Sequence, residues 1–322
     1  MPDILSVIAP IFLLVGLGWW SVRGGHFPAS GLPVLAQFVV RFALPALVFR
    51  SLATRQVAEV LNAPFLVAYT LGSLAAAGAG LAWARWAHRD GLEASALLAM
   101  GVSCSNSAFI GFPVCYQLVG PEAGIGLALC MMVENLLLIP LCLALADTGS
   151  AAHEPFGQAF RRALAGLPKN PLILAIAAGF LFSLFQWPLP APVFKAVDLL
   201  ANASAAAALF FIGGTLVGLS ARETLGDVVS VAFGKLVLHP AAVLIALWLV
   251  GPVSPALHAV AVVMAAAPML GIYPIFGQRH GLGALCSARM VGTTLASFAT
   301  LGLWIALSAG GATTRAGVGL GG

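Results

Sequence analysis

The chain has 322 residues, of which 61% are hydrophobic and only 8% are charged, and its formal net charge is +4. Its mean hydropathy is +1.02 and its pI is about 9.0. A soluble globular protein carries about 25% charged residues, so this composition excludes a soluble enzyme, a disordered protein and a nucleic-acid-binding protein. The few positive charges are better explained as signals of membrane topology than as a patch that binds a polyanion.

Ten apolar stretches follow one another along the chain, each close to the roughly 20 residues that a helix needs to cross a bilayer. The first stretch lacks the basic start and the small-residue cleavage site of a secretory signal, so we expect it to be retained as a span. The predicted fold is an all-α integral membrane protein with ten transmembrane helices. The predicted spans are residues 4–22, 31–52, 62–86, 94–119, 122–146, 171–188, 196–219, 228–250, 255–278 and 284–308.

The longest connection between spans, residues 147–170, divides the chain into two sets of five spans. We predict a first five-helix repeat at 1–147, a cytoplasmic linker at 148–170 and a second five-helix repeat at 171–309. The Gly/Ala/Thr-rich tail at 310–322 is predicted to be disordered.

The linker also contains apolar residues at helical spacing. This pattern fits a short helix lying on the membrane surface, and an ordinary solvated linker is the alternative. The residues concerned are Phe156, Phe160, Ala163, Leu164 and Leu167.

Lys and Arg are distributed unevenly between the two sets of loops. The loops after the odd-numbered spans hold eight of these residues, and the opposite side holds four. Cytoplasmic loops are enriched in Lys and Arg, so we predict a multi-pass protein of the inner or plasma membrane with both termini outside the cytoplasm. Five spans per half make the second half run opposite to the first, as in the inverted repeats of many secondary transporters. The eight residues are Arg23, Arg85, Arg89, Arg161, Arg162, Lys169, Arg222 and Arg279.

Two predicted spans contain Gly and Pro at comparable points. The fourth span places Gly111 and Pro113 within the membrane, and the ninth places Gly271 and Pro274 there, with Tyr273 beside them. Pro removes a backbone donor and Gly relaxes the backbone, so both helices are predicted to be broken. Paired broken helices point to a transport site, and we assign all five residues to substrate binding; two ordinary proline kinks are the alternative.

Polar side chains lie just before the first of these breaks, in the run GVSCSNSAFIGFP. Ser103, Ser105, Asn106 and Ser107 can bond the free backbone groups of a broken helix, a substrate or a small cation. Hydrogen bonding between helices is an equal alternative for the three serines. Asn106, the largest polar group of the run, is predicted to bind substrate.

The fifth span carries Glu134 and Asn135 in MMVENLLLIP. An ionisable residue inside a membrane is by default a functional hypothesis, so we predict that Glu134 carries a coupling proton or ion and that Asn135 belongs to the substrate site. Arg289, in CSARMVGTT of the tenth span, either forms a structural salt bridge with Glu134 or binds a carboxylate in bidentate geometry.

The eighth span carries Lys235 and His239, four residues apart on one helix face. The simplest interpretation is a snorkelling lysine and a core histidine whose hydrogen bonds are satisfied. The second span holds Arg41 near its middle, and the sequence does not identify its partner. Arg41, Lys235 and Arg289 against Glu134 leave a charge of +2 inside the membrane, which favours an anionic substrate.

The five cysteines lie within apolar runs and form no CxxC pair. We interpret them as buried structural thiols and expect neither a metal site nor a disulfide framework. No cofactor is expected beyond a coupling H⁺ or Na⁺.

Four segments resemble the auxin efflux carrier family: SNSAFIGFPV in span four, FALPALVF in span two, ENLLLIP in span five and KLVLHP in span eight. That family includes plant auxin carriers and bacterial relatives often assigned as malonate transporters. The resemblance covers nearly the whole chain, and the spacing from Asn106 to Gly111 and Pro113 is its most specific part.

The resemblance implies a fold related to the bile-acid sodium symporters and sodium/proton antiporters. Spans four and nine would cross as broken helices in a mobile core, and spans one, two, six and seven would form a scaffold and the contact of a homodimer. It also implies carriage of a small organic anion by an elevator-like motion, with Asn106 contacting the substrate and Pro113 and Pro274 as crossover prolines. Span nine has no carboxylate of the kind that holds sodium in the bile-acid branch, which argues against sodium coupling.

We therefore predict a secondary active transporter, not an enzyme, for a small carboxylate or dicarboxylate such as malonate, coupled to H⁺ or Na⁺. The alternatives are a proton- or sodium-coupled cation antiporter and a membrane sensor that binds its ligand without flux. An intramembrane enzyme would need a nucleophile with its base or a metal site, and the sequence contains no HExxH and no evident His partner for Ser103 or Cys104. The expected partners are the substrate, the lipid bilayer and a second copy of the chain.

Overall fold

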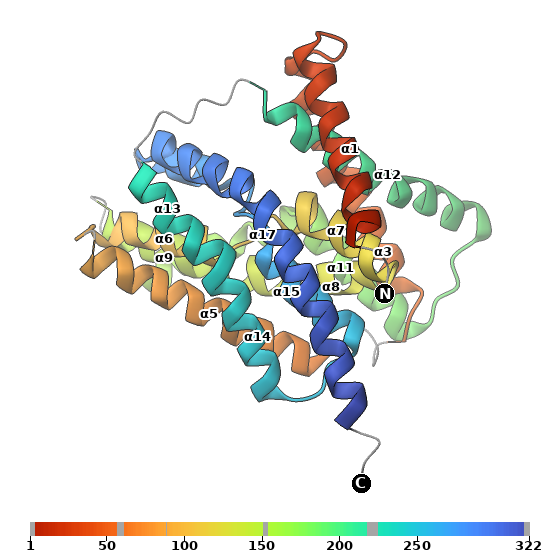
Figure 1. The fold of residues 1–322 in the computed structure, drawn as a ribbon. Helices are drawn as coiled ribbons and strands as arrows, with labels where there is room; N and C mark the ends of the chain where they lie inside the picture. Colours follow the sequence, from red (N-terminus) through yellow and green to blue (C-terminus); the bar gives the residue numbers. More distant parts are fainter. Residues whose placement is uncertain (1–3, 57–60, 88, 151–153, 218–224, 319–322) are drawn as a thin grey trace. The chain divides into compact units, whose positions relative to one another are not determined.

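The chain was analysed as a computed structural model, which describes residues 4–56, 61–87, 89–150, 154–217 and 225–318. The side chains at 4–8, 225–227 and 309–318 lie outside this description. Within the described residues every regular element is a helix, as predicted, apart from one isolated antiparallel pairing between Ser105 and Met269 (Figure 1).

The helices form two compact units, and each unit takes segments from both halves of the sequence. Unit 1 consists of Met1–Asn62, Ala108–Met131 and Pro168–Ser220, and unit 2 consists of Ala63–Ser107, Met132–Leu167 and Ala221–Gly322. The units therefore do not coincide with the two predicted repeats. The helices of predicted spans one, two, six and seven fall in unit 1, and those of spans three, eight, nine and ten fall in unit 2.

Unit 1 is built around a close pair of helices, α1 and α12, which lie side by side (Figure 1). Glycines allow this approach, because a Cβ at Gly18 would lie 2.1 Å from the Phe210 carbonyl oxygen and one at Gly213 would lie 1.9 Å from that of Val15. The helix α3 packs against both α11 and α12. The helices of unit 1 are α1 (Ile4–Arg23), η1 (Ala29–Gly31), α2 (Leu32–Phe38), η2 (Val39–Ala43), α3 (Leu44–Ala53), α7 (Phe112–Val119), α11 (Pro171–Phe185) and α12 (Ala191–Thr215), together with most of η3 (Ser107–Gly111) and of α8 (Glu122–Val133).

Unit 2 is a bundle in which α5 packs against α6 and α14, α6 against α9, and α17 against α13, α15 and α16. Gly72 brings α5 close to α14, since a Cβ there would lie 2.5 Å from the Cα of Val243. The helices of unit 2 are α5 (Ala63–Trp86), α6 (Leu92–Ser103), η4 (Glu134–Leu138), α9 (Ile139–Gly149), α10 (Phe156–Ala165), α13 (Leu225–Phe233), η6 (Gly234–Leu238), α14 (His239–Val250), α15 (Pro255–Ala266), α16 (Tyr273–Arg279) and α17 (Gly283–Val318), and the short 3₁₀ turn η5 (Leu167–Lys169) begins at its edge.

In the described part of the chain, four helices contain a widened π turn, and in each case the second residue of the following α-helix is proline. Proline has no N–H and its ring clashes with the carbonyl four residues earlier, so a wider turn relieves the clash. Pro240 has no N–H to donate to the Leu236 carbonyl, and the Trp304 indole donates to that oxygen at 2.7 Å. Three of these turns also hold a charged residue of the predicted membrane interior: Arg41 in η2, Glu134 in η4 and Lys235 in η6.

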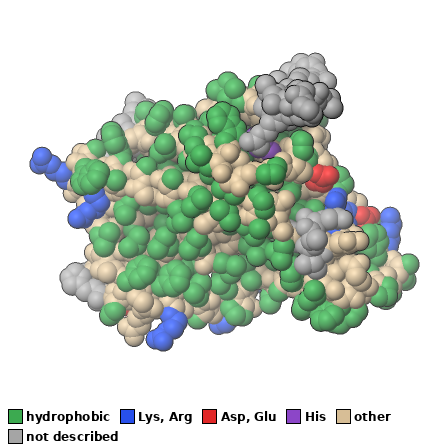
Figure 2. Space-filling model, turned by 90° about the horizontal axis from the view of Figure 1, so that it is seen from below, with side chains coloured by type: hydrophobic (Ala, Val, Ile, Leu, Met, Phe, Trp, Pro, Cys, Tyr) green, Lys and Arg blue, Asp and Glu red, His purple; other side chains and the backbone are tan. Residues whose placement is uncertain are grey.

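Six described helical segments are long and apolar enough to cross a membrane, and a seventh is added if Phe156–Lys169 and Pro171–Phe185 are counted together. The other predicted spans fall on shorter or broken helices, so the ten-span count remains a prediction. Hydrophobic side chains are spread over the whole face shown in Figure 2, and the charged side chains seen there lie near its edges. Trp86 and Leu249 are more than four-fifths exposed. Such a surface suits a lipid environment. The six segments are Ala29–Ala53, Ala63–Trp86, Glu122–Gly149, Ala191–Thr215, Val228–Val250 and Gly283–Ser308.

Two predictions about the connecting segments can be compared with the structure. The apolar pattern of the linker does form a helix, α10, which packs against α9. The segment 310–318, for which the sequence predicts disorder, continues α17 as far as Val318, because it prolongs an existing helix and contains alanine, the best helix former. Arg222, one of the eight loop charges of the cytoplasmic side, lies outside the described residues, and so does the side chain of Arg315, one of the four on the opposite side.

Candidate functional site

Two breaks in the helices of unit 2 pair with each other. The helix α6 ends at Ser103 and the chain is extended at Cys104 before the next helix begins at Ser107; α15 ends at Ala266, and α16 begins only at Tyr273. The Asn106 amide donates to the Pro268 carbonyl at 2.7 Å, and the Leu270 amide donates to that of Cys104 at 3.1 Å. We call the paired segments, 104–106 and 267–272, the crossing. Each segment thus satisfies backbone groups that a broken helix leaves free.

The breaks do not lie quite where the sequence predicts them. Gly111 and Pro113 are helical and belong to unit 1, so the first break precedes them and is not caused by Pro113. In the second helix, Gly271 lies within the break and Pro274 is the second residue of α16. Pro113 is tolerated inside a helix because the π turn before it removes the clash of its ring.

Glu134 is fully buried beside the first segment of the crossing. Its Oε1 accepts hydrogen bonds from the Ser107 hydroxyl at 2.9 Å, the Tyr69 hydroxyl at 3.0 Å and the Ser105 amide at 3.2 Å. The carboxylate therefore lies at the start of the helix that begins at Ser107, where backbone amides favour a negative charge. Its Oε2 has no hydrogen-bond partner among the described residues.

Lys235 is also fully buried, and its Nζ lies at the end of the other broken helix. It donates to the Ala265 carbonyl, in the last turn of α15, at 2.6 Å and to the Ser105 hydroxyl at 2.8 Å. Its third contact is with Nδ1 of His239 at 3.0 Å, and Nε2 of the same ring contacts the Ser73 hydroxyl at 2.9 Å. A positive charge at a helix C-terminus complements the helix dipole.

The charges at the crossing are thus arranged differently from the sequence interpretation. Glu134 forms no ion pair with Arg289 in the described structure, and it is linked to Lys235 through Ser105. The interpretation of Lys235 as a snorkelling lysine is wrong, because its side chain is fully buried and its Nζ contacts Ser105 and Ala265. His239, with both ring nitrogens in contact with polar atoms, is the satisfied core histidine expected.

Asn106 lies at the centre of the crossing and is 6% exposed. Its Nδ2 is 3.5 Å from the position that a Cβ would take on Gly271, so its side chain lies over the second segment. Of the three serines, Ser105 and Ser107 contact the charged pair, whereas the Ser103 hydroxyl donates back to Ala99 within α6. Asn135 follows Glu134 and is half-buried.

Arg289 and Tyr273 form a second polar group in unit 2. Arg289 is 3% exposed, and its Nε has no hydrogen-bond partner among the described residues. The Tyr273 hydroxyl lies beside Arg289 and Cys286 and close to Gly101, where a Cβ would be 3.2 Å from it. A buried guanidinium without a carboxylate is able to take one from a ligand.

Arg41 does not belong to this interior. It lies in π turn η2 and is exposed on unit 1. The buried charges are therefore Lys235 and Arg289 against Glu134, which leaves +1 in place of the predicted +2. The sign still favours an anion.

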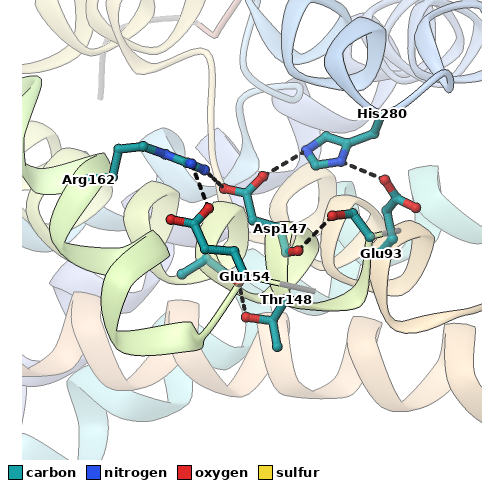
Figure 3. A network of polar contacts seen from close by, with 8 residues as sticks. Glu93, Asp147, Thr148, Glu154, Arg162 and His280 are labelled. Carbon is teal, nitrogen blue, oxygen red and sulfur yellow. Dashed lines mark hydrogen bonds and ion pairs between the residues drawn. The ribbon is translucent and has the colours of Figure 1, made fainter. Parts of the chain in front are cut away.

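A second network of charges joins the helix ends of unit 2, as Figure 3 shows. His280 follows α16, and its ring nitrogens contact Glu93 of α6 at 2.7 Å and Asp147 of α9 at 3.7 Å. Arg162 of α10 pairs with Asp147 at 2.7 Å and with Glu154 at 2.5 Å. The network connects the ends of predicted spans four, five and nine that the loop-charge count assigns to one side of the membrane.

These features define the class: a helical membrane protein whose buried polar site is built where two broken helices meet. Residues 3–305 match the family described as "Membrane transport protein", and the chain belongs to that family, which confirms the resemblance to the auxin efflux carriers. It is thus a multi-pass membrane protein of a transporter family.

Individual relatives agree with this assignment. The chain is 27% identical over 307 residues to the "Putative malonate transporter" of Rhizobium meliloti (strain 1021), and the matched region covers 94% of this chain and 94% of that one. It is 28% identical over 246 residues to the "Uncharacterized transporter YfdV" of Escherichia coli (strain K12), covering 74% of this chain and 76% of that one. It is 26% identical over 152 residues to "Auxin efflux carrier component 3a" of Oryza sativa subsp. japonica, covering 46% of this chain and 24% of that protein.

Sequence reasoning did not assign Lys235, Tyr69 and Ser73 to the crossing. Pro268 and Met269, which form the second break, were also not singled out. A usable signal existed for Lys235, since a lysine in the middle of an apolar stretch and four residues before a His-Pro pair is costly unless it is directed inward. Tyr69 and Ser73 share one face of α5 at helical spacing, but nothing in the sequence connects that face with Glu134.

Proposed function

We propose that this protein is a secondary active transporter of a small organic anion, of the malonate-like carboxylate or dicarboxylate class, which binds at the crossing. The observation that carries the proposal is the crossing itself, where two broken helices meet beside the buried Glu134 and Lys235. The buried Arg289 lies next to Tyr273, the first residue of α16. Broken helices at mid-membrane form the substrate sites of many secondary transporters. The name of the Rhizobium relative supports malonate as the first substrate to test.

In this proposal Asn106 donates its side-chain amide to a carboxylate, and Arg289 supplies the positive charge, directly or through Tyr273. Ser105, Ser107, Asn135 and Gly271 would line the same site. Glu134 would carry the coupling H⁺ or Na⁺, because binding an anion in a buried site is easier when a cation is taken up with it.

Transport would follow from an elevator-type motion of unit 2 against unit 1, so that the crossing faces the two sides of the membrane in turn. The proposal includes ten spans in two inverted repeats, both termini outside the cytoplasm and a homodimer in which unit 1 provides the contact. The exposed apolar side chains of α1, α11 and α12 support the last point.

A proton- or sodium-coupled cation antiporter is the second candidate. One observation favours it: the buried Oε2 of Glu134 has no partner among the described residues, and a carboxylate oxygen of this kind readily takes a cation. The antiporter predicts that cations alone bind, whereas the anion carrier predicts saturable binding of a carboxylate.

The test is thermal unfolding of the purified protein in detergent with malonate, other dicarboxylates, monocarboxylates and indole-acetate. A ligand that binds only the folded state stabilises it by about 2.7 kcal/mol at a concentration of 100 times Kd. We expect such a shift with at least one dicarboxylate, and we expect Asn106→Ala to remove it while the protein stays folded. Asn202→Ala, at an exposed asparagine of unit 1, is the control and should bind normally. A wild-type response to cations alone would replace the anion carrier by the antiporter.

A further inference from the structure

The contacts of the Lys235 ammonium are those of a bound cation. An ammonium has three donors, and all three are used at the crossing: by the Ala265 carbonyl at 2.6 Å, the Ser105 hydroxyl at 2.8 Å and Nδ1 of His239 at 3.0 Å. None of these contacts is with water, because Lys235 is fully buried. Every donor of the ammonium is therefore directed at a fixed protein atom.

The oxygens around Nζ are also those that a small metal cation would use. Hard cations take oxygen ligands, and in transporters with broken helices the coupling ion is held by carbonyls at the C-terminal end of a half-helix. Here that position is the Ala265 carbonyl, with the Ser105 hydroxyl beside it. The Glu134 carboxylate, which accepts the Ser105 amide at 3.2 Å, supplies the negative charge.

We propose that the Lys235 ammonium is a built-in cation at the crossing, which takes the oxygens that a coupling sodium ion would need, so that this protein binds and moves its anion without sodium. Only the part of this inference that concerns binding and movement of the anion rests on the proposed function. The occupation of the cation position is a property of the ligand-free chain.

The arrangement explains two features that the proposed function leaves open. Lys235 and Glu134 form no direct ion pair in the described structure, as expected if each charge first serves the end of a different broken helix. Burying a lysine costs free energy. The proposal gives this buried charge a role, because the ammonium takes the place of an ion that the protein would otherwise have to bind in every transport cycle.

Removing the ammonium should turn the position into a sodium site. In Lys235→Met, a side chain of similar length without charge, the Ala265 carbonyl and the Ser105 hydroxyl lose their donor and Glu134 loses its neighbouring positive charge. Each of these changes favours the entry of a small cation. The double variant Glu134→Gln with Lys235→Met also lacks the negative charge and should not take up sodium.

The experiment measures thermal unfolding in detergent and malonate uptake into liposomes, each in NaCl, KCl and choline chloride at equal ionic strength. Four proteins are compared: wild type, Lys235→Met, the double variant, and Lys195→Met as a control at an exposed lysine of unit 1. We expect wild type and Lys195→Met to respond equally to the three salts. For Lys235→Met we expect a saturable stabilisation by sodium alone, and a malonate affinity that rises with sodium by about 5- to 150-fold, the usual range for coupled ligands.

The inference is overturned if wild type shows a saturable, sodium-specific stabilisation or sodium-dependent uptake. It is also overturned if Lys235→Met folds and responds equally to all three cations. If Lys235→Met folds only in sodium, the inference is supported; if it folds in no salt, the response of wild type decides. Absence of any anion binding in any protein would remove the proposed function, whereas the sodium titration of ligand-free protein would still test the cation position.

Discussion

Unit 2 contains two groups of charged side chains that connect nearly the same helices in opposite ways. At the crossing, Glu134 and Lys235 are fully buried and are joined through a serine. At the helix ends, Arg162 pairs directly with two carboxylates, and its side chain is 60% exposed. Both groups link α6 and α9, or the π turn that precedes it, to the broken helix formed by α15 and α16.

The difference supports the proposal that transport takes place at the crossing, and that the network at the helix ends serves stability. In the network at the helix ends, Arg162 is 60% exposed, while its partners Asp147 and Glu154 are 25% and 19% exposed. Ion pairs that solvent reaches contribute about 0–1 kcal/mol each, so we expect the pairs of Arg162 to add little to stability. Burying a charge costs several kcal/mol unless it is compensated, and a pair of charges that do not touch each other is a poor choice for stability alone. The crossing is thus the group whose charges need a functional explanation.

The largest effect is expected for Glu134→Ala. This change leaves Lys235 buried without a counter-charge and removes the acceptor for Tyr69, Ser105 and Ser107. Loss of one partner of a buried charge pair typically costs about 3–5 kcal/mol. We therefore expect a large fall in the midpoint of thermal unfolding in detergent and loss of substrate-dependent stabilisation.

Glu154→Ala is the matched control, because it removes the same group from the network at the helix ends. It should change the midpoint only slightly. If both substitutions lower the midpoint of thermal unfolding equally, the buried and the helix-end carboxylates contribute equally to stability, and the contrast between the two groups is wrong.

An intermediate effect is expected for Ser105→Ala, which cuts the link between the two buried charges. The Lys235 ammonium loses one of its three acceptors, whereas the Ser105 backbone amide still donates to Glu134. A hydrogen bond to a charged group is worth about 1.5–3 kcal/mol. Ser103→Ala is the control, since its hydroxyl donates back to Ala99 within α6 and lies 3.9 Å from the Cys104 sulfur, and it bonds neither buried charge in the described structure. If thermal unfolding shows the two serines to be equivalent, Ser105 does not link the charges.

Much of the fold was predictable because it depends on local composition. The helix bounds follow the apolar stretches closely: Ala63–Trp86 against the predicted 62–86, for example, and Glu122–Gly149 against 122–146. The linker helix α10 was likewise indicated by the spacing of its apolar residues. Bilayer thickness sets the length of such stretches, so a single sequence is informative about them.

The candidate site was predictable in part. Asn106, Ser105, Ser107 and Glu134 are brought together, because a polar run near a break and a buried acid both need partners. The direction of a side chain within a helix was not predictable, since π turns shift the helix face by part of a turn. Lys235 and Arg41 both lie in such turns, yet Lys235 is buried and Arg41 is exposed. The first break precedes Gly111 and Pro113, which are helical.

The smallest effect is expected for Arg162→Met, which removes a positive charge from the helix ends just as Lys235→Met removes one from the crossing. Arg162 holds Asp147 and Glu154, yet water can solvate both carboxylates once it is gone. The loss should be at most about 1 kcal/mol, and it should shrink further as salt is added, because charges exposed to solvent are screened over about 10 Å at 0.1 M. Thermal unfolding across a salt series measures both quantities. A large loss of stability that does not change with salt would show that the charges at the helix ends matter for stability as much as those at the crossing. The energetic argument for assigning transport to the crossing alone would then fail.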